Sequence, residues 1–134
     1  MWYYVDPHSG IPIYVQIKEQ IKKAVATGLL SEGQQMPSVR ELALKLTINP
    51  NTIAKVYQEL EREGVLQTAR GLGSFVAERR ENSGPQQEAS LDRALEKLMV
   101  EAYQLSVDTD TLYACFIKKL NAWKNRFKKG VKGE

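Results

Sequence analysis

Residues Pro37 to Gly64 read PSVRELALKLTINPNTIAKVYQELEREG and contain the strongest structural signals in the chain. Its first part predicts a short amphipathic helix from Ser38 to Leu46. Ser38 and Glu41 have the spacing of a capping box, in which the serine side chain accepts a hydrogen bond from the glutamate amide. Apolar residues recur at the i, i+3, i+4 and i+7 positions of one helix face. They are Val39, Leu42, Ala43 and Leu46.

A second helix follows after a turn of very few residues. Asn49 is suited to cap it, and Pro50 stands at its first position, where the missing N–H costs nothing. Gly64 ends it at the usual place for a left-handed residue. Ile48 lies in the turn, and Ala43 is small where the helices would cross. The expected apolar face consists of Ile53, Val56, Tyr57 (in part) and Leu60. These features predict a helix-turn-helix.

The start of the second helix carries hydrogen-bonding side chains that are not part of its apolar face: Asn49, Asn51, Thr52 and Lys55. In a helix-turn-helix that binds DNA, this first turn enters the major groove, where short amides and hydroxyls reach base edges. A merely solvated helix start is the alternative. The hairpin that follows favours DNA.

Two runs of strand character come next, Val65 to Thr68 and Ser74 to Ala77. The glycine-rich loop between them predicts a hairpin. A hairpin directly after such a helix is the wing of a winged helix. Arg70 at its tip, with Gly71 and Gly73 allowing close approach of the backbone, suits minor-groove or phosphate contact. No helix follows the Gly-x-Gly, so it is not a nucleotide-binding fingerprint.

On the N-terminal side, a helix is predicted from about Ile13 to Thr27, closed by Gly28. The connection from Leu29 to Met36 has room for one short strand. Before the helix stand Trp2, Tyr3 and Tyr4, which we expect to pack on the body, although they could also stack on nucleotides.

The C-terminal part begins with a polar segment, Arg79 to Ala89, which has Ser-Gly-Pro at its centre and is typical of a linker. Two helices are expected after it, one from about Leu91 to Leu105 and one capped by Asp108. Their apolar stripes are too large for two helices to bury alone, so they fold back on the winged domain or meet a second subunit. The residues expected in this dimer contact are Leu95, Leu98, Leu105, Leu112, Phe116, Leu120 and Trp123. The basic run Lys118, Lys119, Lys124, Arg126, Lys128, Lys129 and Lys132 is either a solubilising tail or a phosphate- or partner-facing surface.

Composition narrows the function classes. With 134 residues, the chain holds either one domain with an appendage or two small units, but not two large independent cores. The net charge of +3 is compatible with binding to nucleic acid but is weak evidence by itself. Its single cysteine excludes an internal disulfide, and its single histidine leaves no Cys/His metal site. No apolar run is long enough for a membrane span, and the N-terminus lacks the pattern of a signal peptide. The acidic residues Glu59, Glu61 and Glu63 have no partner at nucleophile spacing, so an enzyme is not expected.

These residues together resemble the GntR family of bacterial transcription regulators, and within it the small YtrA-like subfamily. The resemblance covers about residues 12–76 in the order and spacing of the family; the C-terminal half matches only in length and helical pattern. The matching pieces are Pro12-Ile13-Tyr14, Gln16-Ile17, Pro37-Ser38, Arg40, Leu42-Ala43, Asn49-Pro50-Asn51-Thr52, Tyr57, Leu60, Glu63-Gly64, Arg70-Gly71-Leu72-Gly73 and Phe75-Val76.

The resemblance implies a homodimer that binds a palindromic operator, usually as a repressor of its own operon, which often encodes a transporter. It gives Arg40 a phosphate or base contact. Many larger members carry an arginine where this chain has Pro50, so a guanine contact from that position is absent. The full set of predicted DNA-binding residues is Ser38, Arg40, Asn49, Asn51, Thr52, Lys55, Tyr57, Arg70, Gly71 and Gly73.

The sequence therefore predicts a mainly α fold with a small β-wing: a winged helix-turn-helix followed by a two-helix C-terminal dimerisation unit. The expected divisions are residues 1–78, a linker over residues 79–89, and a helical region with a basic tail over residues 90–134. We expect a cytoplasmic, non-enzymatic, homodimeric regulator that binds double-stranded DNA without a cofactor, metal or membrane. The alternative is a winged-helix adaptor that binds protein. The operator, the regulated genes and any effector ligand are not predicted.

Overall fold

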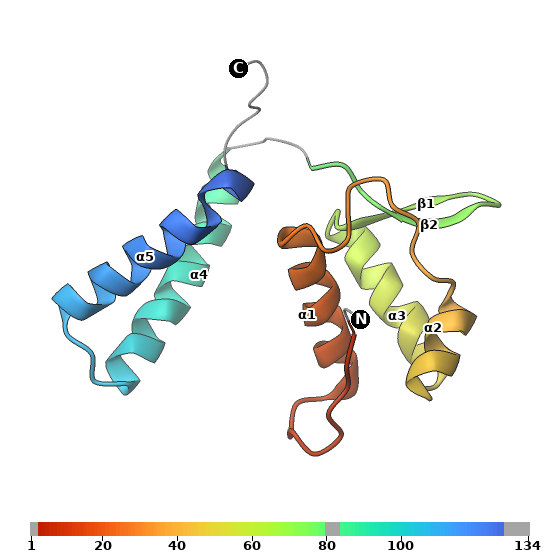
Figure 1. Ribbon diagram of the computed structural model, residues 1–134, viewed down its shortest axis with the longest axis horizontal. Helices are drawn as coiled ribbons and strands as arrows, with labels where there is room; N and C mark the ends of the chain where they lie inside the picture. The colour runs from red at the N-terminus through yellow and green to blue at the C-terminus, as the bar shows by residue number, and fades with distance from the viewer. Residues whose placement is uncertain (1–2, 80–83, 128–134) are drawn as a thin grey trace. The chain divides into compact units, whose positions relative to one another are not determined.

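The computed structural model describes residues 3–79 and 84–127 (Figure 1). Those residues form a mainly helical fold with one two-stranded antiparallel sheet, as predicted. The chain divides into two compact units, Met1–Arg79 and Arg80–Glu134. The elements in order are α1 (Ile13–Ala26), α2 (Val39–Leu46), α3 (Pro50–Arg62), β1 (Leu66–Ala69), β2 (Gly73–Val76), α4 (Pro85–Gln104) and α5 (Thr109–Phe127).

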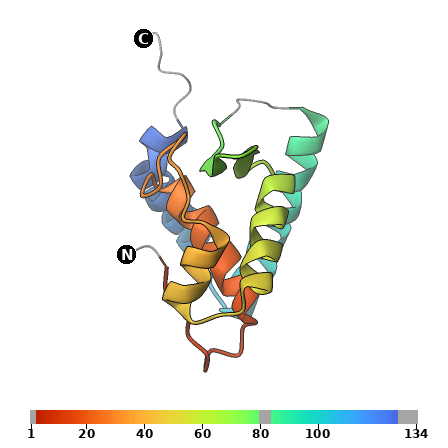
Figure 2. The ribbon, with the colours of Figure 1, turned by 90° about the vertical axis from the view of Figure 1, so that its right-hand side faces the viewer.

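Helix α3 is the centre of the first unit and packs against α1, α2 and β1. Figure 1 shows it between α1 and α2, and Figure 2 shows the same three helices from the side of the hairpin. The core is apolar, and each large side chain buried in it contributes roughly 1.5–3 kcal/mol. Its largest fully buried members are Ile17, Ile21, Leu42, Ile53, Val56, Leu60 and Val76.

The predicted caps of the helix-turn-helix are all formed. The amide of Glu41 donates to Ser38 Oγ at 3.0 Å, and the Ser38 amide donates to Glu41 Oε1 at 2.8 Å, which completes the capping box. Asn49 Oδ1 accepts from the amide of Asn51 at 2.8 Å. Between the helices, Thr47 takes the left-handed conformation with φ of 56°, which turns the chain sharply enough for α2 and α3 to cross.

The hairpin is reinforced by a third extended segment. Leu66 pairs with Val76 and Ala69 pairs with Gly73 in the β1–β2 register. The short strand expected within Leu29 to Met36 is present as an isolated bridge between Gln35 and Phe75. The amide of Met36 donates to the Ser74 carbonyl at 2.8 Å, and the amide of Val76 donates to the Gln34 carbonyl at 2.9 Å. The wing is therefore anchored to the body along β2.

The N-terminal segment packs along α1, as expected for part of it. Tyr3 and Val5 pack against the core, whereas Tyr4 is exposed. The Gln16 amide nitrogen donates to the Asp6 carbonyl at 2.9 Å, and Gln20 makes hydrogen bonds to the backbone of Tyr4. Trp2 lies outside the described residues.

In the second unit, α4 begins earlier than the sequence suggested. We expected a linker through Ala89 and a helix from Leu91, but the helix starts at Pro85. Proline is favoured at the first helical position, so the Ser-Gly-Pro group ends the linker instead of lying at its centre. Asp108 caps α5 as predicted, because its Oδ1 accepts from the Thr111 amide at 2.8 Å. Hydrogen bonds from Thr111 hold the pKa of Asp108 below its usual range. Within the described part of the chain, no helix is long and apolar enough to cross a membrane.

Candidate nucleic-acid interface

The first turn of α3 presents polar side chains at the surface. Asn49, Asn51 and Lys55 are exposed, and Thr52 is half-buried. Arg40 is exposed in the first turn of α2. These residues lie around the helix-turn-helix and leave its apolar faces to the core. The predicted contacts of α2 and α3 thus lie at the surface of two helices that pack against each other.

Two side chains of this region already act as helix caps. Ser38 Oγ accepts from the Glu41 amide, and Asn49 Oδ1 accepts from the Asn51 amide. The Ser38 hydroxyl hydrogen and the Asn49 amide N–H groups remain as donors, which suits them to phosphate oxygens. Asn51 and Thr52 make no side-chain hydrogen bond to another described residue, so they are better placed than the caps for contacts with bases.

Lys55 is held by an aromatic ring from α1. Its Nζ lies 4.7 Å from the centroid of the Tyr14 ring, within the range of a cation–π contact. The ammonium therefore leans toward α1 rather than away from the body. This geometry favours a contact with the sugar-phosphate backbone over one with a base in the groove.

The role expected for Tyr57 needs correction. We included it among the DNA contacts, but its side chain is buried, with 6% of its surface exposed, and its hydroxyl donates to the Pro37 carbonyl at 2.7 Å. Burial raises the pKa of Tyr57, with a smaller effect from the Glu41 carboxylate, so the hydroxyl stays protonated and able to donate. Tyr57 joins α3 to the segment that enters α2, because the i+4 position after Ile53 faces the core.

The tip of the wing exposes Arg70, Gly71, Leu72 and Gly73. Gly71 and Gly73 have φ of 80° and 115°, a region that L side chains rarely adopt. Gln35, which is not among the predicted site residues, donates from Nε2 to the Leu72 carbonyl at 2.8 Å. A polar residue in a short extended segment gives no sequence signal for such a long-range bond.

Charge is distributed unevenly along α3. At its C-terminal end, Lys18 lies 3.2 Å from Glu59 and also pairs with Glu63, and Lys22 lies 3.1 Å from Glu63. Burial pushes the pKa of Glu63 upward, but the hydrogen bonds and charges of the two lysines outweigh it and lower that pKa. The same bonds raise the pKa of Lys18. These acidic groups are neutralised away from the first turn of α3. Within residues 3–79 and 84–127, Arg40 and Arg70 form no ion pair that would compete with phosphate.

The second unit exposes most of its apolar side chains when described by itself. Ala102 is the one buried residue in the described parts of α4 and α5. Among the predicted dimer contacts, Leu112 and Trp123 are half-buried, and Leu95, Leu98, Leu105, Phe116 and Leu120 are exposed. Of the basic run, Lys118, Lys119, Lys124 and Arg126 belong to α5, and Lys128, Lys129 and Lys132 lie outside the described residues.

Comparison with known proteins supplies the family. The model of the bacterial regulatory proteins of the gntR family matches residues 13–76, which include the helix-turn-helix and the wing. The HTH-type transcriptional repressor YtrA of Bacillus subtilis (strain 168) is 37% identical over 119 residues, covering 88% of this chain and 91% of that protein. The chain belongs to the GntR family.

Solved structures agree with this assignment. The GntR chain is similar to the crystal structure of a transcriptional antiterminator from Listeria monocytogenes EGD-e, with a TM-score of 0.75 and 33% identity over 89% of this chain and 90% of that one. It is also similar to AraR(DBD) in complex with operator ORX1, with a TM-score of 0.50 and 31% identity over 56% of this chain and 93% of that one. Family membership makes the chain a DNA-binding transcriptional regulator and not an enzyme, as the sequence predicted.

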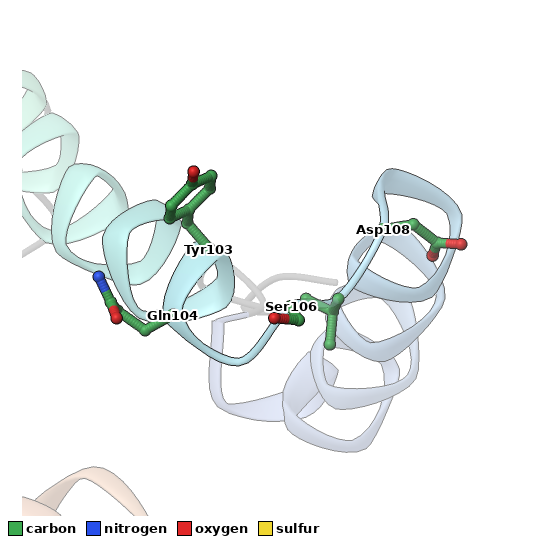
Figure 3. Close-up of a pocket in the computed structure, with 5 residues that line it drawn as sticks. Tyr103, Gln104, Ser106 and Asp108 are labelled. Carbon is green, nitrogen blue, oxygen red and sulfur yellow. The ribbon is translucent and has the colours of Figure 1, made fainter.

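One hollow in this GntR chain lies at the turn between α4 and α5 (Figure 3). Tyr103, Gln104, Ser106, Val107 and Asp108 line it, and it is open to solvent. In Figure 3 the labelled side chains point in different directions and do not converge on a common centre. Asp108 is already engaged as the cap of α5. The described residues also contain no group of three or more side chains suited to hold a metal ion.

Proposed function

We propose that the chain is a homodimeric repressor that binds a palindromic operator through the first turn of α3 and the wing of each subunit. The observation that carries the proposal is the polar surface at the start of α3, where Asn51 is exposed and Thr52 is half-buried. The phosphate-binding candidates Lys55, one turn further along α3, and Arg40, on α2, are exposed as well. Side chains of this kind reach base edges when the first turn of a recognition helix enters the major groove.

The proposed contacts divide into two kinds. Asn51 and Thr52 discriminate between bases, because their amide and hydroxyl groups are not used within the described fold. Arg40, Lys55 and the caps Ser38 and Asn49 position the protein on the phosphates, which supplies affinity but no sequence information. Binding of AraR(DBD) to its operator, in a structure that aligns with this chain, supports a DNA-binding role for the winged unit.

The wing makes the second proposed contact. Arg70 at its tip carries a charge with no carboxylate partner among the described residues, and Gly71 and Gly73 have no side chain that would keep the backbone away from DNA. An arginine in a narrow minor groove is attracted by the enhanced negative potential there. We assign the wing to the minor groove or the phosphates that flank it.

A second copy of this chain is the proposed occupant of the apolar face of α4 and α5. Leu95, Leu98, Phe116 and Leu120 each keep 38–43% of their surface exposed, so covering what remains would contribute roughly 0.5–1.3 kcal/mol for each side chain. Two such pairs from two subunits form one shared core. A two-fold pair of winged units also matches the symmetry of a palindromic site with half-sites about 34 Å apart.

Regulation of its own operon, such as one that encodes a transporter, is part of the proposal and rests on the YtrA-like resemblance over almost the whole chain. The proposed place of action is the cytoplasm, where the DNA of a bacterium is reached directly. No effector ligand is assigned.

The test combines selection with sedimentation. The full chain is used to retain duplexes from a random library, and its mass is then measured free and bound to a retained duplex. We expect an inverted repeat and two chains per duplex. A variant ending at Arg80 should remain folded but sediment as a monomer with most of its affinity lost. A dimer of that variant would place the interface in the winged unit. Retention of no sequence in preference to another would favour a protein-binding adaptor.

A further inference from the structure

Leu72 is the one exposed residue of the wing tip, among Arg70, Gly71, Leu72 and Gly73, that has no part in the proposed contacts. It follows Gly71 and precedes Gly73, and 68% of its surface is exposed. Single exposed leucines are common on protein surfaces and need no explanation by themselves. This leucine differs because its backbone is fixed on both sides and because it lies two residues from Arg70.

Two hydrogen bonds fix the backbone of Leu72. Its amide donates to the Ala69 carbonyl at 2.8 Å, which closes the turn. Its carbonyl accepts from Gln35 Nε2 at 2.8 Å. A side chain on Gly73 would place a Cβ 3.1 Å from the same nitrogen, so glycine leaves the space that Gln35 occupies. The tip is thus organised before it meets a partner.

Gln35 is itself held in place by backbone bonds of its neighbours. The amide of Gly33 donates to the Val76 carbonyl at 2.8 Å, and that of Met36 donates to the Ser74 carbonyl at 2.8 Å. The segment that carries Gln35 therefore moves with β2. A leucine kept at the surface on a stiff support loses little conformational entropy when it is buried in a groove.

We propose that Leu72 enters the minor groove beside Arg70 and is a specificity-determining residue that disfavours base pairs carrying the guanine N2 amine. The inference rests on the proposed function of the wing. In the minor groove, G·C pairs differ from A·T pairs by this amine, which is a hydrogen-bond donor. Methyl groups that cover the amine remove its water without offering an acceptor, and an unpaired buried donor is costly. Apolar side chains are used in the minor groove by many DNA-bending proteins.

The test changes only the minor-groove face of the DNA. The probe is a duplex retained in the selection described above. In its flanks, 2,6-diaminopurine replaces adenine to add the N2 amine, and inosine replaces guanine to remove it. Both replacements preserve the major-groove edges that α3 would contact. We expect the wild-type chain to bind the amine-bearing flank at least about fivefold more weakly than the flank without the amine.

Leu72→Asn separates the leucine from Arg70, because an asparagine oxygen can accept from the amine. This variant should reduce the discrimination to less than about twofold. Leu29→Asn, at a leucine that is 64% exposed outside the wing, should keep the full wild-type discrimination. Equal binding of both flanks by the wild-type chain would overturn the inference, and so would discrimination that persists in Leu72→Asn. A wild-type chain that bound no duplex would overturn the proposed function and this inference together.

Discussion

The Tyr57→Phe substitution removes one hydroxyl from the core of the winged unit and keeps the ring. In the structure that hydroxyl donates to the Pro37 carbonyl at 2.7 Å, and the ring is buried. Losing a hydrogen bond of this kind costs roughly 0.5–1.5 kcal/mol, and a buried acceptor left without a partner costs roughly 1–3 kcal/mol. Pro37 is half-buried, so water reaches part of the site and the smaller of these two energy ranges applies. We expect a loss of about 1–1.5 kcal/mol in the free energy of unfolding.

Native-state hydrogen exchange of the α3 amides measures this loss within the winged unit alone, whatever the second unit does. A loss of about 1–1.5 kcal/mol corresponds to exchange of the slowest amides that is about 5- to 13-fold faster. Tyr14→Phe is the matched control. Tyr14 contacts Lys55 through its ring, which phenylalanine retains, so its exchange should stay within about twofold of wild type.

The difference in stability between the wild type and this variant depends on pH, because only the wild type has the buried hydroxyl. Burial raises the pKa of Tyr57 above its ordinary value of 10.0 in the folded chain. The stability associated with the neutral form is complete below pH 10 and is lost as pH rises above it, because the unfolded chain ionises first. The difference between wild type and Tyr57→Phe should therefore shrink above pH 10. Unchanged exchange in Tyr57→Phe at neutral pH would show that the bond to the Pro37 carbonyl does not stabilise the winged unit. A loss of base discrimination in the folded variant would return Tyr57 to the DNA contacts.

Three further outcomes are expected. Arg40→Ala and Arg70→Ala should each weaken binding to all duplexes. Titration at several salt concentrations should show that the slope of log affinity against log salt falls by about 0.9 for every phosphate that each subunit no longer neutralises. An unchanged slope for Arg70→Ala would remove the wing from the phosphates. The pKa of Glu63 is lowered from 4.5 in the folded chain, so its contribution to stability is complete above pH 4.5 and is lost as pH falls below that value. Below pH 4.5 the wild type should therefore lose roughly a few tenths of a kcal/mol more than Glu63→Gln in urea unfolding; parallel pH profiles would contradict the ion pairs with α1. Gln35→Met should speed amide exchange at the wing tip and weaken DNA binding. Gln67→Met, the same change on β1, should do neither. Equal effects of the two variants would mean that the bond to the Leu72 carbonyl does not cause the faster exchange or the weaker binding.

The helix-turn-helix could be predicted from sequence because its signals are local. The capping box at Ser38 and Glu41, the Asn49-Pro50 start and the apolar stripes of both helices depend on neighbours within a few residues, and the structure confirms each of them. The hairpin was equally local, since glycines mark its turn.

What the sequence did not predict depends on distant contacts or on competing local signals. The bond from Gln35 to the Leu72 carbonyl joins residues 37 positions apart, and no sequence pattern in a short extended segment predicts such a bond. Tyr57 has both an apolar ring and a hydroxyl, so its place at the edge of the α3 stripe suited either the core or DNA; the partner at Pro37 decides for the core. Pro85 suited either a linker or a helix start, and the helix that follows decides for the start.

If the first turn of α3 distinguishes base sequences, Asn51→Ala and Thr52→Ala should change binding to two duplexes in different ways. One duplex is retained by the full wild-type chain in the selection, and the other has the same length and a scrambled sequence. Each variant should lose roughly 1–3 kcal/mol on the retained duplex, about 5- to 150-fold in affinity, and keep wild-type affinity for the scrambled one. Equal losses on both duplexes would contradict the assignment of these two residues to the bases.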